Sequence, residues 1–258
     1  MLETDPRAPE KVSRVAEQPL LDLGRLGTFD DSGVMPCSVV TDGASKYLYY
    51  TGWNRGVSVP YRNAIGVAVS TDGGSTFERV HEGAVVDRSA EEPFFTATPF
   101  VLRESAGWRM WYASSTGWVV VDDRPEPVYV IKYAESDDGI VWRRDNVTCI
   151  HPKHPEEANA RPWVIAGAGG YRMWFCYRRS RGYRDDLHAS YRIGYAESTD
   201  GITWDRKDDE AGIDVSATGW DSRMLAYPSL YEHAGTMHML YNGNGFGESG
   251  IGHAVAAG

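Results

Sequence analysis

The sequence is poor in cysteine and in cationic side chains, and each shortage excludes a class of protein. Its 258 residues include three cysteines, Cys37, Cys149 and Cys176, an odd number without the spacing of a metal site. We expect free, buried thiols in a reducing compartment, and therefore a cytoplasmic protein. The 26 Lys and Arg residues face 36 Asp and Glu residues, a net charge of −10. This excludes a general nucleic-acid binder, which needs a basic surface.

Long apolar runs and the common cofactor motifs are also missing. No run of 18 apolar residues could cross a membrane, and no basic segment precedes an apolar run as in a signal peptide. The seven histidines do not have the spacing of metal ligands. There is no phosphate-binding loop, no dinucleotide fingerprint and no Gly-x-Ser-x-Gly motif. We therefore expect neither a metal nor another cofactor.

Aromatic residues and glycine, in contrast, are plentiful. The chain has 9 Trp, 15 Tyr, 7 Phe and 28 Gly, which suits many short strands joined by tight turns, and no stretch has the pattern of a long amphipathic helix. In residues 191–204 apolar side chains alternate at Tyr191, Ile193 and Tyr195, then a Ser-Thr-Asp-Gly turn follows, and a new strand begins at Ile202. The same hairpin pattern recurs at residues 131–142, 65–77 and 251–255.

The repeated hairpin belongs to a longer repeat of about 60 residues. Its landmark prolines, Pro36, Pro99, Pro162 and Pro228, follow one another at intervals of 63, 63 and 66 residues. Four short strands per repeat match the blade of a β-propeller. We predict an all-β fold, with residues 1–258 forming one four-bladed propeller domain. The blade repeats would begin near residues 30, 92, 156 and 221, with residues 1–8 frayed. Five blades are the alternative, but no residues remain to build the fifth.

The fourth repeat lacks its last strand, and the N-terminus offers a substitute. Residues 12–17, Val-Ser-Arg-Val-Ala-Glu, are similar to residues 77–82, Phe-Glu-Arg-Val-His-Glu, which close the first repeat. We predict that this segment completes the last blade and closes the ring, which would remove an exposed sheet edge.

Most of the repeated residues are expected to be structural. Aromatic side chains recur at equivalent positions in several repeats, as packing between blades requires. These are Trp111, Trp142, Trp174 and Trp204. The turn aspartates are expected to stabilise hairpins, because residues 70–77 resemble the Asp-box of sialidase propellers, a turn that lies far from catalysis.

Function is expected where the repeats differ, at the mouth of the central channel. Each innermost strand carries a landmark proline, and each proline follows a carboxylate. Clustered carboxylates shift each other's pKa values apart, so that one can be an acid and another a base or nucleophile. The predicted catalytic residues are Asp31, Glu92, Glu157 and Asp221.

Polar and aromatic residues near the strand ends are predicted to bind the substrate at the same mouth. An arginine fork binds carboxylate or phosphate groups, and aromatic rings can stack on sugars. The predicted substrate-binding residues are Arg161, Arg223, Trp53, Asn54, Arg62, Arg178, Arg192, Tyr227 and Asn242, with Trp118 and Tyr183 as further stacking candidates.

These repeats resemble the propeller glycosidases of the arabinanase, levansucrase and invertase superfamily and their relatives, the β-mannoside phosphorylases. The resemblance covers nearly the whole chain through Pro-x-Val-Ile, Tyr-Arg-Met-Trp-Phe and Gly-Tyr-Ala-Glu-Ser-x-Asp-Gly-Ile-x-Trp units. It implies catalytic carboxylates at the starts of inner strands, matching Asp31, Glu92 and Glu157. The superfamily usually has five blades, however, and its Trp-Met-Asn-Asp-Pro-Asn-Gly, Arg-Asp-Pro and Glu-Cys motifs are absent here.

The leading hypothesis is therefore an enzyme that cleaves or transfers a glycosidic bond of a small-molecule or oligosaccharide substrate. Asp31 would be the base or nucleophile, and Glu92 or Glu157 the general acid. Two alternatives are different chemistry on a specialised small molecule, such as cyclisation or elimination, and a non-catalytic sugar-binding propeller.

Overall fold

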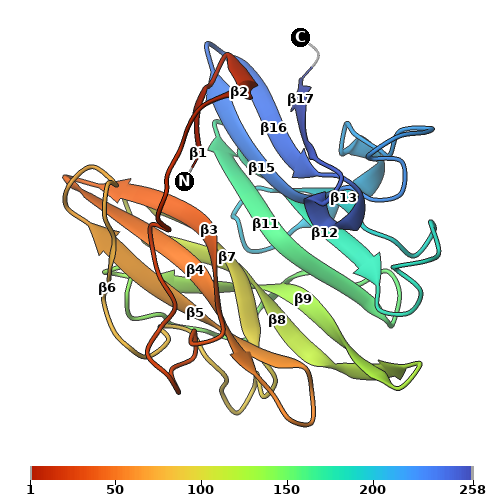
Figure 1. Cartoon of the computed structure of the whole chain (residues 1–258), viewed down its shortest axis with the longest axis horizontal. Coiled ribbons are helices and arrows are strands. Elements are labelled where there is room, and N and C mark those ends of the chain that lie inside the picture. Colours follow the sequence, from red (N-terminus) through yellow and green to blue (C-terminus); the bar gives the residue numbers. More distant parts are fainter. Residues whose placement is uncertain (1, 257–258) are drawn as a thin grey trace.

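Four antiparallel sheets stand around a central axis in the computed structural model, which describes residues 2–256 (Figure 1). In each sheet the strands follow chain order, and the innermost strands β3, β7, β11 and β15 are neighbours around the axis. The predicted four-bladed β-propeller is confirmed. Two short 3₁₀ helices, η1 (Asp208–Glu210) and η2 (Asn244–Gly247), lie in loops. Among the described residues no helix is long and apolar enough to span a bilayer.

The blade boundaries follow the repeat seen in the sequence. The first blade contains β3 (Gly33–Asp42), β4 (Ser45–Arg55), β5 (Tyr61–Ser70) and β6 (Glu78–Arg79). The second contains β7 (Thr96–Glu104), β8 (Gly107–Val121), β9 (Arg124–Ser136) and β10 (Thr148–Ile150). The third contains β11 (Glu157–Gly167), β12 (Gly170–Arg179), β13 (Arg192–Ser198) and β14 (Asp205–Arg206). The fourth contains β15 (Ala226–His233), β16 (Thr236–Asn242) and β17 (Ile251–Val255).

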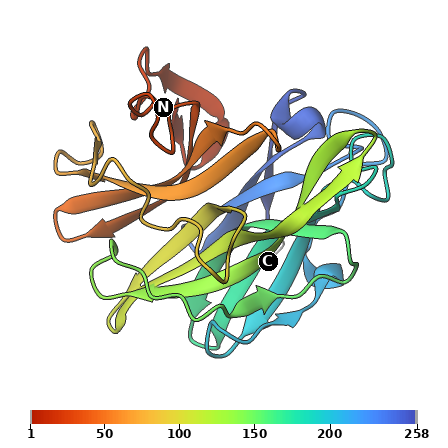
Figure 2. The same cartoon turned by 90° about the horizontal axis from the view of Figure 1, so that it is seen from below.

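The N-terminal segment does not close the ring in the predicted way. Strands β1 (Leu2–Asp5) and β2 (Ala8–Val15) pair with each other as a separate hairpin, so the expectation of a frayed segment is also wrong for residues 2–8. The hairpin lies beside β15, where Tyr231 donates to the Pro6 carbonyl at 3.0 Å (Figure 1). Figure 2 shows the same hairpin, in red, at one edge of the molecule above the orange strands of the first blade. Because β1 and β2 pair with each other, the backbone N–H and C=O groups of β2 that could have paired with the fourth sheet already have partners.

Apolar contacts between blades form the core, and the repeated tryptophans lie in them as predicted. Trp111 is fully buried and joins a cluster shared by the second and third blades, where its indole donates to the Gly201 carbonyl at 2.8 Å. Trp204 packs edge-on against it. Trp174 belongs to the cluster shared by the second, third and fourth blades, and Trp142 packs against the cluster shared by the first and second.

The landmark prolines mark a backbone irregularity near the axis. The residue before three of them, Thr98, Arg161 and Tyr227, has φ of 47°, 54° and 58°, and the strand register shifts there. Such a φ is unfavourable for residues other than glycine. Hydrogen bonds between blades hold it: Thr98 N–H donates to Thr51 Oγ1, and Arg161 N–H donates to Thr98 Oγ1.

The three cysteines are free and buried, as predicted. Burial raises the pKa of the Cys149 thiol to about 12 and that of Cys176 to about 11. A thiol is a nucleophile only as the thiolate, so these two groups are unreactive near neutral pH.

Candidate active site

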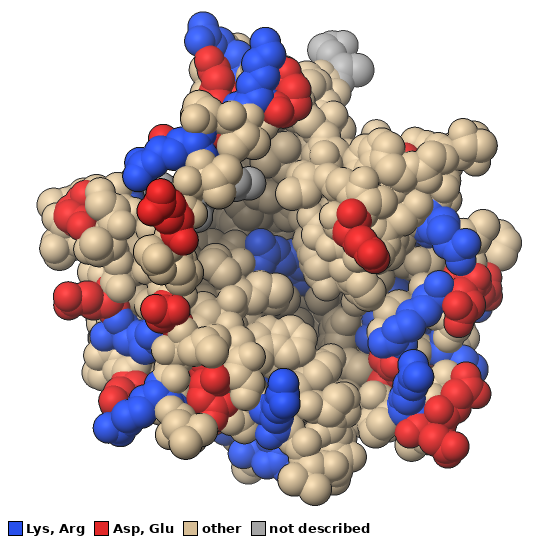
Figure 3. Space-filling view, viewed as in Figure 1, with Lys and Arg blue, Asp and Glu red and all other residues tan. Residues whose placement is uncertain are grey.

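All four blades contribute to one cavity on the central axis, with a volume of about 230 Å³. It lies where the inner strands begin, the second strands end and the third strands begin, which is the mouth expected from the sequence. Aromatic rings dominate its wall. The aromatic lining residues are Trp53, Tyr61, Phe95, Tyr129, Tyr183, Tyr191, Tyr227 and Phe246. Figure 3 shows the molecule hollowed at the centre of one face, with a basic side chain at the base and most acidic side chains toward the periphery.

Arg178 is the buried charge of this cavity. The end of β12 carries it, its residue is 3% exposed, and its guanidinium lies 4.0 Å from the Tyr183 ring centroid. Its Nε donates to the Tyr191 hydroxyl at 3.1 Å, while Nη1 and Nη2 donate to the carbonyls of Arg179 and Pro127. The ion pairs among the described residues do not include Arg178.

The phenols around Arg178 remain protonated near neutral pH. Burial raises the pKa of Tyr183 to about 12, and it also raises the pKa values of Tyr191 and Tyr227 well above their usual range. Ionisation of these groups in a poorly solvated wall is costly, so they act as neutral donors and apolar faces. Arg178 and the exposed Arg184 are then the charged residues of the described lining.

One buried carboxylate stands at the rim. Glu126 on β9 accepts a hydrogen bond from the Tyr183 hydroxyl at 3.2 Å and another from Arg184 Nη1. It borders a second hollow of about 430 Å³ that shares Tyr61, Tyr183 and Arg184 with the central cavity. Glu126 can therefore reach a ligand that extends from the cavity toward solvent.

The structure does not gather the predicted catalytic carboxylates around the cavity. Glu92 is buried and accepts from the Tyr112 hydroxyl at 2.9 Å, with Arg144 Nη1 at 3.1 Å and Lys132 Nζ at 3.7 Å. Every one of these partners belongs to the second blade or the loop that leads to its last strand. Glu92 thus tethers the outer part of its own blade to the start of the inner strand.

The same arrangement recurs around the molecule. Glu157 is buried and paired with Arg206 of β14, and Asp221 is buried and accepts from the Tyr241 hydroxyl at 3.0 Å. In the first blade the corresponding residue is Asp30, which accepts from Arg79 Nε at 2.7 Å and from Tyr50 at 3.1 Å. Each carboxylate stands 20 residues before a tyrosine of the second strand, a spacing that identifies the pattern in the sequence.

Asp31, the predicted base, lies beside this pattern rather than in it. It is partly exposed and accepts from Ser32, Asn54 and the Gly27 amide at distances of 2.7 to 3.0 Å. The Ser32 hydroxyl is the main cause that lowers the pKa of Asp31, helped by the Gly27 amide. The structure places Asp31 in a local loop network, and it is not a lining residue of the central cavity.

Three predicted binding residues, Trp53, Arg178 and Tyr227, do line the cavity, together with Tyr183. Trp118 packs against Tyr61 and Phe95 behind the wall. The other predicted binding residues are not among the lining residues. Three of them donate hydrogen bonds elsewhere: Arg161 to the Pro36 carbonyl, Asn54 to Asp31 and Asn242 to the Phe246 carbonyl. Arg192 forms an ion pair with Asp214. Arg62 and Arg223 are exposed.

Strand alternation explains which lining residues the sequence interpretation missed. Tyr61 and Asn63 line the cavity, whereas Arg62 between them faces solvent, as period-2 alternation in β5 requires. Tyr191 lines the cavity and the neighbouring Arg192 does not. The sequence pattern favoured the charged residues Arg62 and Arg192, whereas their neighbours on the opposite face of the sheet line the central cavity.

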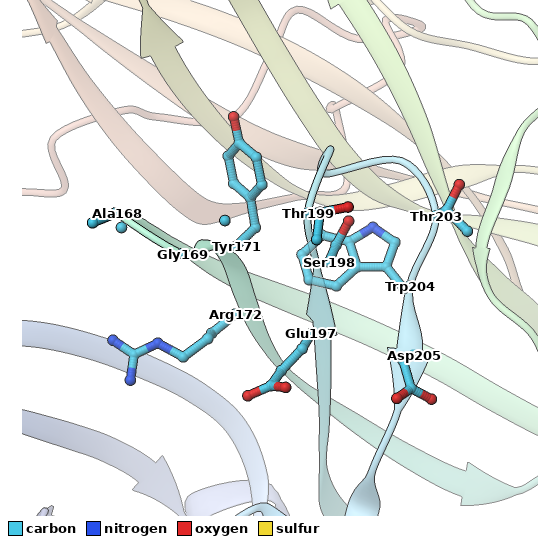
Figure 4. Close-up of a pocket in the computed structure, with 12 residues that line it drawn as sticks. Ala168, Gly169, Tyr171, Arg172, Glu197, Ser198, Thr199, Thr203, Trp204 and Asp205 are labelled. Atoms are coloured by element: carbon cyan, nitrogen blue, oxygen red, sulfur yellow. The ribbon is translucent and has the colours of Figure 1, made fainter.

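A larger surface groove lies at the other ends of the third blade's strands, formed by its hairpin turns (Figure 4). Glu197 and Arg172 lie in it, and the main cause that lowers the pKa of Glu197 is its hydrogen bond from Lys207. One blade forms this groove, and its polar residues stabilise the Ser198–Gly201 turn. We therefore place the candidate site in the central cavity. Among residues 2–256, no cluster of three or more His, Cys, Asp or Glu side chains could hold a metal ion.

Comparisons with known proteins give relatives in sequence and neighbours in fold. No protein-family model matches the chain. It is 43% identical over 246 residues to the uncharacterized proteins Rv1502 and MT1551 from two strains of Mycobacterium tuberculosis, covering 95% of this chain and 78% of each relative.

The solved structures that resemble it share the fold at low sequence identity. A thermostable family-43 glycoside hydrolase has a TM-score of 0.60 at 15% identity, covering 90% of this chain and 90% of that protein. An endo-arabinase from Bacteroides thetaiotaomicron has a TM-score of 0.63 at 13% identity, covering 96% and 80%. A β-1,2-mannobiose phosphorylase from Listeria innocua also has a TM-score of 0.63 at 13% identity, covering 95% and 63%. The fold is that of the propeller superfamily expected from the sequence, and the chain belongs to the family of the Mycobacterium tuberculosis proteins Rv1502 and MT1551.

Proposed function

We propose that the protein is a carbohydrate-active enzyme that takes a sugar ring into the central cavity. The observation that carries this proposal is the cavity itself, to which all four blades contribute and in which aromatic faces surround a few polar groups. Ligand pockets typically combine an apolar wall with a small number of placed polar groups. The neighbouring folds of an endo-arabinase and a mannobiose phosphorylase support a carbohydrate as the ligand.

Glu126 is the candidate acid–base group. Glycoside cleavage by the common mechanisms needs two carboxylates that flank the bond. Glu92, Glu157 and Asp221 are held inside their own blades, whereas Glu126 stands at the rim with a tyrosine and an arginine to orient it. A single carboxylate suits a reaction in which the acceptor brings its own nucleophilic oxygen, as inorganic phosphate does in phosphorolysis.

A non-catalytic sugar-binding propeller is the second candidate. The observation that favours it is that the described lining residues of the central cavity include no carboxylate pair. Binding then depends on the aromatic wall and the cavity's polar groups alone.

A glycoside screen with one matched pair of variants separates these candidates. Aryl glycosides and sugar phosphates are offered with and without inorganic phosphate, while binding is followed by calorimetry. For the enzyme we expect turnover, and we expect Glu126→Gln to lower kcat at least 100-fold with ligand binding retained. Asp122→Asn, an exposed change in the same hairpin turn and outside both hollows, is the control and keeps turnover.

The remaining outcomes are equally informative. Dependence on phosphate identifies phosphorolysis, and saturable binding without turnover of any compound selects the second candidate. Absence of both binding and turnover across the panel contradicts the proposed function.

A further inference from the structure

Arg178 is a buried cation whose hydrogen bonds are incomplete. A guanidinium carries five N–H groups. Three of them have acceptors here: the Tyr191 hydroxyl at 3.1 Å, the Arg179 carbonyl at 3.1 Å and the Pro127 carbonyl at 3.4 Å. Two N–H groups therefore remain on a side chain that lines the cavity and is almost inaccessible from elsewhere.

Three partly buried arginines elsewhere in the propeller show what is missing at Arg178. Arg79, Arg144 and Arg206 each have a carboxylate partner, namely Asp30, Glu92 and Glu157. Burial of a charge is strongly unfavourable unless a counter-charge and hydrogen bonds compensate for it. Arg178 has the rings of Tyr129, Tyr183 and Tyr191 instead, with centroids 4.0 to 5.7 Å away. Cation–π contacts with these rings compensate for part of the burial of this charge, but Arg178 still lacks the carboxylate partner that the other three arginines have.

Asn63 is a second unsatisfied group in the same cavity. Its residue on β5 is 5% exposed, and its buried Oδ1 atom has no hydrogen-bond donor among the described residues. A buried acceptor without a partner is unfavourable, because it has lost its hydrogen bonds to water and gained none in return. Arg178 comes from the third blade and Asn63 from the first, so a ligand between blades can serve both.

We propose that the natural ligand is an acidic sugar, whose carboxylate or phosphate group binds Arg178 and whose hydroxyl group donates to Asn63. This inference rests on the proposed function and names the substrate class for the same cavity. A carboxylate or phosphate can accept the two free N–H groups of the guanidinium together. A hydroxyl group supplies the donor that Asn63 lacks, and the aromatic wall covers the ring. The volume of about 230 Å³ suits one sugar ring rather than a long chain.

Matched sugars test the inference. Glucose, galactose and mannose are each compared with the corresponding uronic acid and 6-phosphate by calorimetry. We expect an acidic member to bind at least 10-fold more tightly than its neutral counterpart, and the better of the two acids identifies a carboxylate or a phosphate ligand. In Arg178→Gln this preference should disappear. Arg172→Gln, an exposed change at the opposite ends of the strands, should keep it.

A second variant covers the case in which Arg178→Gln does not fold. Asn63→Asp leaves Arg178 in place but adds a negative charge to the cavity, so it should weaken acidic sugars at least 10-fold more than neutral ones. Inorganic phosphate is the further probe. If phosphate binds but acidic and neutral sugars bind equally, the anion is a separate co-substrate and the inference is wrong, although the proposed function stands. If neutral sugars bind and no acid or phosphate does so more tightly, Arg178 is structural. If no sugar of either kind binds, the result contradicts the proposed function, and the acidic-sugar inference that rests on it is then wrong as well.

Discussion

At the scale of single residues, the same side-chain type has different roles according to its place in the blade. An arginine on an outer strand, such as Arg206, meets a carboxylate at the start of the inner strand of its own blade. Arg178 lies next to the last residue of a second strand, at the mouth, and contacts tyrosines and carbonyl groups. An arginine such as Arg206 stabilises its own blade, whereas the charge of Arg178 is available to a ligand.

This difference predicts the effect of removing a blade carboxylate. Glu92→Gln leaves Lys132, whose side chain is 7% exposed, without its anion, so we expect a loss of about 3 kcal/mol in the free energy of unfolding. The folded fraction should bind ligand as wild type does. Urea titration and calorimetry measure the two effects.

Asp31→Asn is the control, with a change of about 1 kcal/mol or less, because Asp31 has hydrogen bonds but no ion pair among the described residues. A Glu92→Gln protein of normal stability that had lost turnover would restore Glu92 to the catalytic role predicted from the sequence.

The sequence could identify the location of the site but not the residues that form it. The repeat predicted a site at the starts of the inner strands, where the structure has a cavity that Trp53, Arg178 and Tyr227 line. Whether a carboxylate points to the axis or into its own blade depends on contacts with side chains 20 and about 50 residues away. The 20-residue spacing is visible in the sequence, but its meaning follows only from these contacts. Glu126 belongs to a long hairpin that the other blades do not repeat, so comparison of the repeats could not reveal it.

At the scale of the structural element, the Ser-x-Asp-Gly turns show why local chemistry was the most predictable part of the chain. In the third blade Asp200 Oδ1 accepts the amides of Ile202 and Thr203 at 2.8 Å, and the Ser198 hydroxyl at 2.9 Å. Gly201 has φ of 76°, where a side chain would also collide with Arg109. All of the hydrogen bonds lie within a few residues, so the turn is specified by its own sequence.

The Asp200 turn also predicts a dependence of stability on pH. The Ile202 and Thr203 amides are the main causes that lower the pKa of Asp200 to about 2, from 3.8. A lowered pKa in the folded state stabilises the protein above the unfolded pKa, and that contribution is lost as pH falls from about 4 through 2. We expect wild type to exceed Asp200→Asn in stability at pH 6, and the difference to shrink between pH 4 and pH 2. Chemical denaturation of both proteins across this range provides the measurement. A difference that stays constant with pH would show that the carboxylate charge does not contribute.

At the scale of the whole molecule, buried apolar clusters join neighbouring blades at three of the four junctions around the ring, and the fourth junction differs. Buried clusters join the first blade to the second, the second to the third, and the second and third to the fourth. None of the described clusters contains buried residues of both the first and the fourth blades. The β1–β2 hairpin lies at this junction instead (Figure 1). The repeat predicted the number of blades, because it counts units; it could not predict how the ring ends, because the N-terminal strand had two possible partners.

This uneven packing predicts where the propeller opens first. Sheet β15–β17 has an apolar seam on one side and the N-terminal hairpin on the other, and apolar Ile251 and Val255 on its outer strand are more than half exposed. Local opening free energies follow buried apolar contacts. We expect the amides of β16 to exchange with deuterium at least 10-fold faster than those of β8 and β12, the second strands of the second and third blades.

Deletion of residues 1–15 should accelerate exchange in β15 and β16 and leave β8 unchanged, because the hairpin contacts the fourth blade through Tyr231 and Pro6. Equal protection of β8, β12 and β16 would mean that the junction between the first and fourth blades is as strong as the other three. Ligand binding in the cavity joins all four blades, so it should slow exchange in β16 more than in β8.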